Sequence, residues 1–396
     1  MPPTLRHRSL HGRTLGLTVL LLLVLCGAGL WRRRDLRGLA LLLRAADAQG
    51  WQRRLADIGR EPVGASLVVI PTDQGTVRAR LYRPRHVSGR TVVVVTGVHP
   101  AGMNEPRLLR LARALASTGH LVVTPELPDL RQFSLTPSVT RAVEQVTAWT
   151  AAQPTLAADG RVTLLGVSFS GGLAVVAAGR PMLRDAVQAV ITIGGHDDLP
   201  RVMRRFCTPP GALDGPLPHL YGMAIMLLQQ SETLVPPSQR DAFATAVRRF
   251  LQASYDERLD VAMARAEYAD IDRAARQMDA PSRDWLTRLV ARDAGGLAIR
   301  LATACTAATA DDAPAASPTL SPARAPLPSA PLFLLHGRTD TLILPDESAR
   351  LAARAAAGRP VRLLVTDALT HADASSTTDL LDVAALAHFW GEALAR

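Results

Sequence analysis

The sequence of 396 residues predicts an α/β protein with a mainly parallel sheet. Short apolar and β-branched runs alternate with helical patterns of about 10–15 residues, which is typical of βαβ units. Hydrophobic residues make up 48% of the chain and charged residues 20%, so a buried core can form and wholesale disorder is excluded. The alternation lapses once, between about residues 199 and 308, where only helical patterns occur.

Eight strands are expected. The run TVVVVT at Thr91–Thr96 is continuous and β-branched, as expected for a strand buried on both faces. The first two strands flank a turn at 71–75 and form a hairpin pattern. The expected strands are Ser66–Ile70, Thr76–Tyr82, Thr91–Thr96, His120–Thr124, Arg161–Leu165, Gln188–Ile193, Pro331–His336 and Val361–Thr366.

Helical patterns follow most of these strands and fill the interruption. In the α/β part we expect helices at Pro106–Thr118, 138–152, Leu173–Ala178, Asp346–Ala357 and 378–395. In the interruption we expect Tyr221–Gln230, Arg240–Ala253, Asp256–Met278 and Trp285–Leu301. Met223, Met226, Leu227 and Leu228 form an apolar stripe that predicts the core of this helical part, or else a surface for an acyl chain or a membrane.

Composition divides the chain into six segments. Residues 1–35 are basic and apolar, and residues 36–62 read as a helical connector. The α/β core is split between 63–198 and 331–396, with the helical insertion at 199–308 between its parts. Residues 309–330 are rich in Ala, Pro and Ser, which predicts a mobile linker before the second part of the core.

The N-terminal segment predicts a membrane anchor. Residues 15–31 carry no charge, and arginines precede and follow them. A helix over these 17 residues is about 25 Å long, at the short end of what spans a bilayer. A cleaved signal peptide followed by export is the alternative, although Arg32, Arg33 and Arg34 oppose it, and a buried helix of a soluble protein is a third reading. Because arginines flank both sides, the positive-inside rule assigns no orientation.

Charge and cysteine usage exclude several functions. The formal net charge is +10 and the chain contains no lysine, which excludes a P-loop lysine, a Schiff base and a Ser–Lys dyad. Aromatic residues make up only 4%, so we expect no nucleic-acid partner. Cys26, Cys207 and Cys305 form no C-x-x-C pair and predict no zinc site, while a Cys207–Cys305 disulfide stays open.

The stretch LLGVSFSGG at 164–172 carries the first chemical signal. Ser168 directly follows an expected strand and precedes Gly171, Gly172 and an expected helix. This context is that of the G-x-S-x-G nucleophile elbow, with Ser170 in place of the last glycine. The positions two before and two after the serine must be small because the turn brings them together, and Ser170 is small enough. A Gly/Ser-rich turn without catalytic function is the alternative.

The eight strands, the insertion after the sixth and this serine resemble the α/β-hydrolase superfamily, with a core similar to dienelactone hydrolases and esterases. The resemblance covers roughly 60–200 and 326–396. It implies an α/β-hydrolase fold, a helical cap at 199–308 and a triad in the chain order Ser, Asp or Glu, His. The stretch HGRTDTLILP at 336–345 resembles the acid loop of that family, so Asp340 is the expected acid. His371, in the loop after the eighth strand, is the expected base.

The resemblance also implies an oxyanion hole. One donor is the backbone N–H of Phe169, directly after the nucleophile. The other comes from the loop after the third strand, where Val98 is expected rather than His99. His99 is a possible pocket residue or an ordinary loop histidine. Asp197 or Asp198, after the sixth strand, is an alternative acid.

These residues together predict a serine hydrolase for a carboxylic ester or related small-molecule acyl substrate, without metal or organic cofactor. Peptidase, thioesterase and acyltransferase activities stay open, because one fold hosts many reactions. A non-catalytic binding scaffold of the same fold at the membrane is the alternative from another class. The sequence assigns no oligomeric state.

Overall fold

The computed structural model describes residues 33–257, 260–308, 317–370 and 380–396, and it contains one eight-stranded sheet in the order β1-β2-β4-β3-β5-β6-β7-β8. Strand β2 pairs antiparallel with both neighbours, and the pairs from β4 to β8 are all parallel. The strands are β1 (Val63–Thr72), β2 (Gly75–Pro84), β3 (Thr91–Val95), β4 (Val122–Pro125), β5 (Val162–Val167), β6 (Val187–Ile193), β7 (Leu332–Gly337) and β8 (Val361–Thr366). The prediction of eight strands in a mainly parallel sheet is confirmed.

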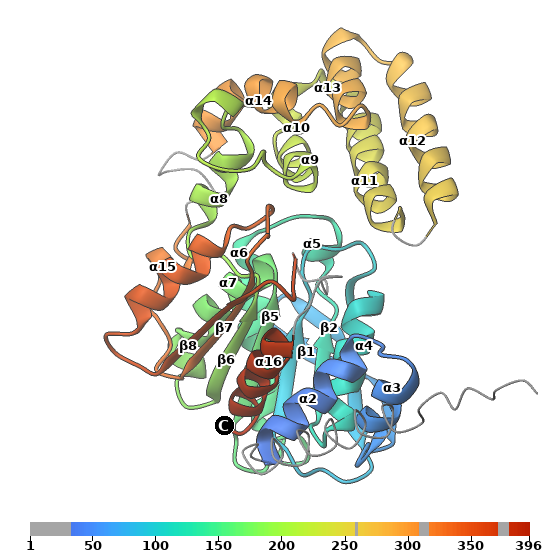
Figure 1. Cartoon of the computed structure of the whole chain (residues 1–396). Helices are drawn as coiled ribbons and strands as arrows, with labels where there is room; N and C mark the ends of the chain where they lie inside the picture. The colour runs from blue at the N-terminus through green and yellow to red at the C-terminus, as the bar shows by residue number, and fades with distance from the viewer. Residues whose placement is uncertain (1–32, 258–259, 309–316, 371–379) are drawn as a thin grey trace, which may run out of the picture.

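Helices cover both faces of the sheet (Figure 1). One face carries α2 (Arg33–Ala45), α4 (Pro106–Ser117) and α16 (Leu380–Ala393). The other carries α6 (Pro137–Ala152), α7 (Phe169–Ala178) and α15 (Pro345–Ala355). Alternate residues of the central strands face the two layers, as Val93 and Val95 pack in one hydrophobic cluster and Val92 and Val94 in the other. Shorter elements are α3 (Gly50–Asp57), α5 (Pro128–Arg131), η1 (Gly102–Asn104) and η2 (Pro181–Leu183).

The region expected as a helical connector belongs to the core. Helix α2 lies beside α16 (blue and dark red in Figure 1), and Leu41 of α2 is fully buried. A Cβ on Gly38 would collide with the carbonyl of Ala387, and one on Gly391 would lie 2.7 Å from the carbonyl of Arg34. The two helices therefore approach at glycines, where the backbones can touch.

The insertion is helical, as predicted, and stands beyond one end of the sheet (Figure 1). Its elements are α8 (Leu199–Phe206), η3 (Pro210–Ala212), α9 (Leu220–Gln229), α10 (Ser231–Leu234), η4 (Pro237–Gln239), α11 (Arg240–Asp256), α12 (Val261–Arg276), α13 (Ala280–Val290) and α14 (Ala294–Ala308). Met223, Met226 and Leu227 are buried in its core, as the first reading of the stripe expects. Cys207, at the end of α8, is disulfide-bonded.

The single helix expected at Trp285–Leu301 is wrong, because the structure has two helices there. Arg292 has a φ of 58°, which ends α13 in the left-handed region. The carboxylate of Asp293 then accepts the N–H of Gly296 at 2.8 Å and caps the start of α14.

The mobile linker expected at 309–330 is also wrong for 317–330, which packs on the core and includes η6 (Pro322–Arg324). Leu320 and Ser321 are fully buried. The carbonyl of Thr319 accepts the hydroxyl of Thr140 at 2.7 Å, and the hydroxyl of Ser321 accepts the N–H of Leu199 at 2.9 Å. Composition alone missed these bonds because they join residues far apart in the sequence.

The expected membrane anchor lies outside the described residues. In the part of the chain that the structure does describe, none of the helices is both long and apolar enough to cross a bilayer.

Candidate active site

Ser168 occupies a strained turn between β5 and α7. Its φ and ψ are 58° and −135°, a conformation that a residue with a side chain rarely adopts and that costs about 1–3 kcal/mol. Its N–H donates to the carbonyl of Ile193 at 2.7 Å, so the turn is tied to the end of β6. The side chain sits at the N-terminus of α7, where the helix dipole favours developing negative charge. This is the geometry of a nucleophile elbow.

Small neighbours let this turn close, as the sequence analysis expects. A Cβ on Gly166 would collide with the carbonyl of Ser170, and one on Gly171 would lie 2.8 Å from the Cα of Gly195. Ser170 itself is fully buried, and its hydroxyl donates to the carbonyl of Thr96 at 2.6 Å. The serine that replaces glycine in the motif therefore holds the loop after β3.

The loop after β3 lies directly against Ser168. A Cβ on Gly97 would be 3.1 Å from the Cβ of Ser168 and 3.7 Å from its Oγ. The N–H of His99 donates to the carbonyl of Leu130 at 3.2 Å, so it is already engaged. The N–H groups of Val98 and Phe169, in contrast, make no hydrogen bond to any residue within the described ranges. Of the two alternatives in this loop, Val98 is the donor left available.

Asp340 lies in the loop after β7 and is 2% exposed. Its Oδ1 accepts the N–H groups of Leu342 at 2.9 Å and Ile343 at 3.1 Å, which fix the carboxylate. Its Oδ2 lies 3.4 Å from Nε2 of His336. His336 is itself held through both ring nitrogens, because Nε2 donates to the carbonyl of Ile343 at 2.8 Å and Nδ1 lies 2.6 Å from the hydroxyl of Ser348.

His371 lies outside the described residues, so its side chain has no place in this geometry. The chain before it is described as far as Thr370. A Cβ on Gly337 would collide with the carbonyl of Leu369 and would lie 2.5 Å from that of Thr370. The backbone that leads into His371 therefore crosses the end of β7, three residues before Asp340.

Asp197 and Asp198, the alternative acids, are engaged in ion pairs. Asp197 pairs with Arg354 at 2.6 Å and Arg201 at 3.3 Å. Asp198 caps α8 by accepting the N–H of Arg201 at 2.9 Å. Glu347 completes the cluster, because its Oε2 accepts the N–H groups of both aspartates at 2.9 and 3.0 Å. These carboxylates join the loop after β6 to α8 and α15.

His99 is a buried neutral imidazole next to the cap. Its Nδ1 accepts the N–H of Ala101 at 3.1 Å, which places the proton on Nε2. Burial lowers the pKa of His99 to about 4, while Glu105 acts in the opposite direction. Nε2 is buried without a hydrogen-bond partner in the described structure, and the ring packs against Tyr255 of α11 with a centroid distance of 4.3 Å.

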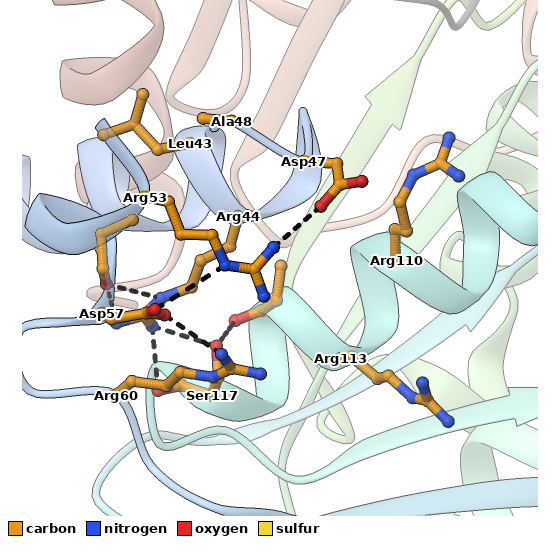
Figure 2. Close-up of a pocket in the computed structure, with 12 residues that line it drawn as sticks. Leu43, Arg44, Asp47, Ala48, Arg53, Asp57, Arg60, Arg110, Arg113 and Ser117 are labelled. Atoms are coloured by element: carbon orange, nitrogen blue, oxygen red, sulfur yellow. Dashed lines mark hydrogen bonds and ion pairs between the residues drawn. The ribbon is translucent and has the colours of Figure 1, made fainter. Parts of the chain in front are cut away.

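A separate pocket lies away from Ser168, between α2, α3 and α4 (Figure 2). It has a volume of about 190 Å³, and five arginines line it: Arg44, Arg53, Arg60, Arg110 and Arg113. None of the residues predicted for catalysis lines this pocket.

Sequence analysis missed two bonds that position the candidate site. Tyr221 of α9 donates its hydroxyl to the carbonyl of Val98 at 2.8 Å, across 123 positions of sequence, and no motif signals it. The bond from Ser170 had a signal, namely the serine where the motif has glycine. A hydroxyl in that place can donate to a neighbouring strand end, whereas glycine cannot.

An eight-stranded sheet with a serine elbow after β5 and a helical insertion after β6 defines the α/β-hydrolase architecture. No family model and no curated protein matches the sequence. Among solved structures, an esterase of Pyrobaculum calidifontis is 17% identical, with 91% of each chain covered and a TM-score of 0.44. A bacterial brefeldin A esterase is 18% identical, with 91% of this chain and 81% of that chain covered and a TM-score of 0.46.

A dienelactone hydrolase of Anabaena variabilis is 14% identical, with 84% of this chain and 97% of that chain covered and a TM-score of 0.42. These neighbours are consistent with the α/β-hydrolase superfamily. At such identities and TM-scores they carry no argument about the reaction, which rests on the residues of this chain.

Proposed function

We propose that this chain is a serine hydrolase that cleaves a carboxylic ester or a related acyl substrate through an acyl-enzyme. Ser168 Oγ attacks the carbonyl carbon while His371 takes its proton, and Asp340 orients the imidazole and stabilises its charge. The N–H groups of Val98 and Phe169 stabilise the oxyanion. His371 then protonates the leaving alcohol, and water, activated by the same imidazole, releases the acid and restores Ser168.

The observation that carries the proposal is the positive φ of Ser168 at a helix start, with an unengaged N–H on each side. Strain of this kind persists only where the surrounding structure enforces it. Here the bond from Ser168 to Ile193 and the close approach of Gly97 do so. The position of Asp340 at the end of β7, beside the chain that leads into His371, supports the rest of the triad.

A fluorophosphonate probe tests the nucleophile, because it reacts covalently with an activated serine. We expect labelling of the wild-type protein and none of Ser168→Ala. Ser170→Ala is the matched control, since it removes the other hydroxyl of the motif, and it should still be labelled at Ser168. Absence of labelling in well-folded wild-type protein would overturn the proposal and favour the non-catalytic scaffold, and labelling of Ser168→Ala would assign the wrong nucleophile.

We also propose that residues 15–31 attach the hydrolase to a membrane. Carbonate-washed membranes should retain the full chain and release a chain that begins at Arg33, which keeps α2 intact. A truncation at residue 36 would cut into α2, so its failure to fold would confuse the result. An intact mass lacking the N-terminal segment would instead support a cleaved signal peptide.

A further inference from the structure

We infer that the helical insertion, through Tyr221, positions the peptide that supplies the oxyanion donor. This inference rests on the proposed function and assigns the insertion a part in the reaction beyond covering the site. Tyr221 belongs to α9, whereas the loop that it holds leaves the sheet at β3.

The peptide group between Gly97 and Val98 carries the candidate N–H, and the peptide groups on both sides of it are held. On one side, the carbonyl of Thr96 accepts the hydroxyl of Ser170 at 2.6 Å. On the other, the carbonyl of Val98 accepts the hydroxyl of Tyr221 at 2.8 Å. The N–H of His99, in the same peptide group as that carbonyl, donates to Leu130 at 3.2 Å. The central peptide group is thereby fixed while its own N–H stays available.

The chemistry of Tyr221 suits a permanent donor. Burial raises the pKa of Tyr221 well above its usual range, so the hydroxyl keeps its proton. Its ring packs against Phe133 in a T-shaped contact with a centroid distance of 6.1 Å, which restrains the side chain. Oxyanion donors act through preorganisation, so a loop that moves freely stabilises the transition state less than a fixed one.

Tyr221→Phe removes only the hydroxyl, and Tyr255→Phe is its matched control. Tyr255, also in the insertion, donates to Glu105 at 3.2 Å, outside the peptide groups that flank Val98. With p-nitrophenyl butyrate as the probe, we expect Tyr221→Phe to lower kcat about tenfold with KM within about twofold. Its affinity for a boronic acid that mimics the tetrahedral intermediate should fall by a similar factor. Tyr255→Phe should change neither value by more than about twofold.

Hydrogen–deuterium exchange of the peptide that covers residues 96–104 separates this inference from the proposed function. We expect faster exchange in Tyr221→Phe and unchanged exchange in Tyr255→Phe, whether or not the protein hydrolyses the probe. Wild-type exchange in Tyr221→Phe would overturn the inference, and so would equal effects of both variants on kcat. Failure of Ser168 to react with a fluorophosphonate would overturn the proposed function alone.

An independent observation concerns the pocket of Figure 2, and we propose that it binds a phosphate group. Five guanidinium groups line it against two carboxylates, Asp47 and Asp57. Arg53 contacts both carboxylates and Arg60 pairs with Asp57 at 3.1 Å. Arg110 and Arg113, one turn apart on α4, make no ion pair with any described residue.

Arg44 gives this pocket a fixed floor. Its NH1 donates to the carbonyl and the hydroxyl of Ser117, both at 3.0 Å, and its Nε donates to the carbonyl of Ala56 at 2.8 Å. Burial, and then the charge of Arg60, lower the pKa of Arg44, which indicates positive charge that its surroundings do not neutralise. Guanidinium groups suit phosphate oxygens because they offer several donors in one plane.

Inorganic phosphate and lipid vesicles test this proposal and separate its two possible sources. Phosphate should raise the melting temperature of the full chain in a saturable way, and Arg110→Gln/Arg113→Gln should lose this effect. Arg248→Gln/Arg265→Gln removes the same charge from the insertion and should keep it. Equal shifts in wild type and Arg110→Gln/Arg113→Gln, or no shift with phosphate and no preference for the vesicles below, would overturn the proposal.

The full chain, in vesicles of phosphatidylcholine with or without one quarter phosphatidylglycerol, forms the second arm. If the phosphate comes from lipid, the Arg110→Gln/Arg113→Gln variant alone should lose a preference for phosphatidylglycerol. If wild type and variant respond alike to phosphatidylglycerol but differ with free phosphate, the pocket binds a soluble phosphate compound.

Discussion

The loops after β3 and β6 flank the nucleophile elbow, because β5 lies between those strands, and they use their polar groups in opposite ways. In the loop after β3, the carbonyls of Thr96 and Val98 are held by hydroxyl groups and the N–H of Val98 stays available. In the loop after β6, the N–H groups of Asp197 and Asp198 both donate to Glu347.

The difference separates residues for chemistry from residues for folding at the same edge of the sheet. A loop that binds a transition state must leave donors unengaged and hold everything around them. A loop that joins a cap to the core satisfies its own groups. Two aspartates near an active site are therefore weak candidates for catalysis when arginines and a helix start already use them, as they do Asp197 and Asp198.

The largest expected effect compares the acid after β7 with the aspartates after β6. Asp340→Asn keeps an oxygen for the N–H groups of Leu342 and Ile343 but loses the charge that orients the histidine. We expect kcat to fall by a factor on the order of 10³–10⁴. Asp198→Asn, which still caps α8, should lower kcat by less than about threefold. Esterase assays of both variants measure this, and the reverse order would make Asp198 the acid.

The next effect concerns the contact of the β3 loop with Ser168. Gly97→Ala places a Cβ 3.1 Å from the Cβ of Ser168, so either the loop or the serine must shift. We expect kcat to fall by about 10²-fold, because small displacements of reacting groups are costly. Gly211→Ala is the control, since a Cβ there meets nothing within 4 Å, and it should be neutral. Wild-type kcat in Gly97→Ala would place the oxyanion loop elsewhere.

For the loop after β6, the expected effect is on stability. Glu347 is 5% exposed and also binds Arg201 at 2.6 Å, so Glu347→Gln weakens several bonds together. We expect the free energy of unfolding to fall by about 2–3 kcal/mol, with kcat nearly unchanged. Asp367→Asn breaks an exposed pair with Arg338 and should cost less than about 0.5 kcal/mol. Urea unfolding distinguishes the two, and a loss of kcat without a loss of stability would contradict the comparison.

The smallest effect comes from the buried histidine that each loop carries. Burial lowers the pKa of His99 to about 4 and lowers that of His196 as well. As the pH falls below the ordinary histidine pKa of about 6.5, the unfolded chain binds protons that these folded imidazoles do not, so stability decreases. Above that pH the contribution vanishes.

The slope for each histidine is at most about 1.4 kcal/mol per pH unit between its unfolded and folded pKa. For His99 this window runs from about pH 6.5 down to about pH 4. Unfolding curves across this range should show a smaller slope in His99→Gln and in His196→Gln than in wild type. A slope that neither substitution changes would mean that these imidazoles charge in the folded state.

Much of the fold could be predicted from sequence because its signals are local. All eight strands lie where β-branched runs end at turns, and Ser168 stands at the elbow that its small neighbours allow. The long-range bonds could not be predicted, because nothing near Tyr221 or Thr319 in sequence names a partner. The split between α13 and α14 was missed for another reason, since Arg292 is an unusual residue for a left-handed turn.

The seam between α2 and α16 makes the fold a device for carrying load. Gly38 and Gly391 let the first and last described helices touch along their backbones, so a pull on the chain before Arg33 reaches α16 before it reaches the sheet. Helix α16 begins at Leu380, shortly after His371 in the chain. If residues 15–31 are held in a bilayer, tension on that tether enters the enzyme beside the segment that supplies its base.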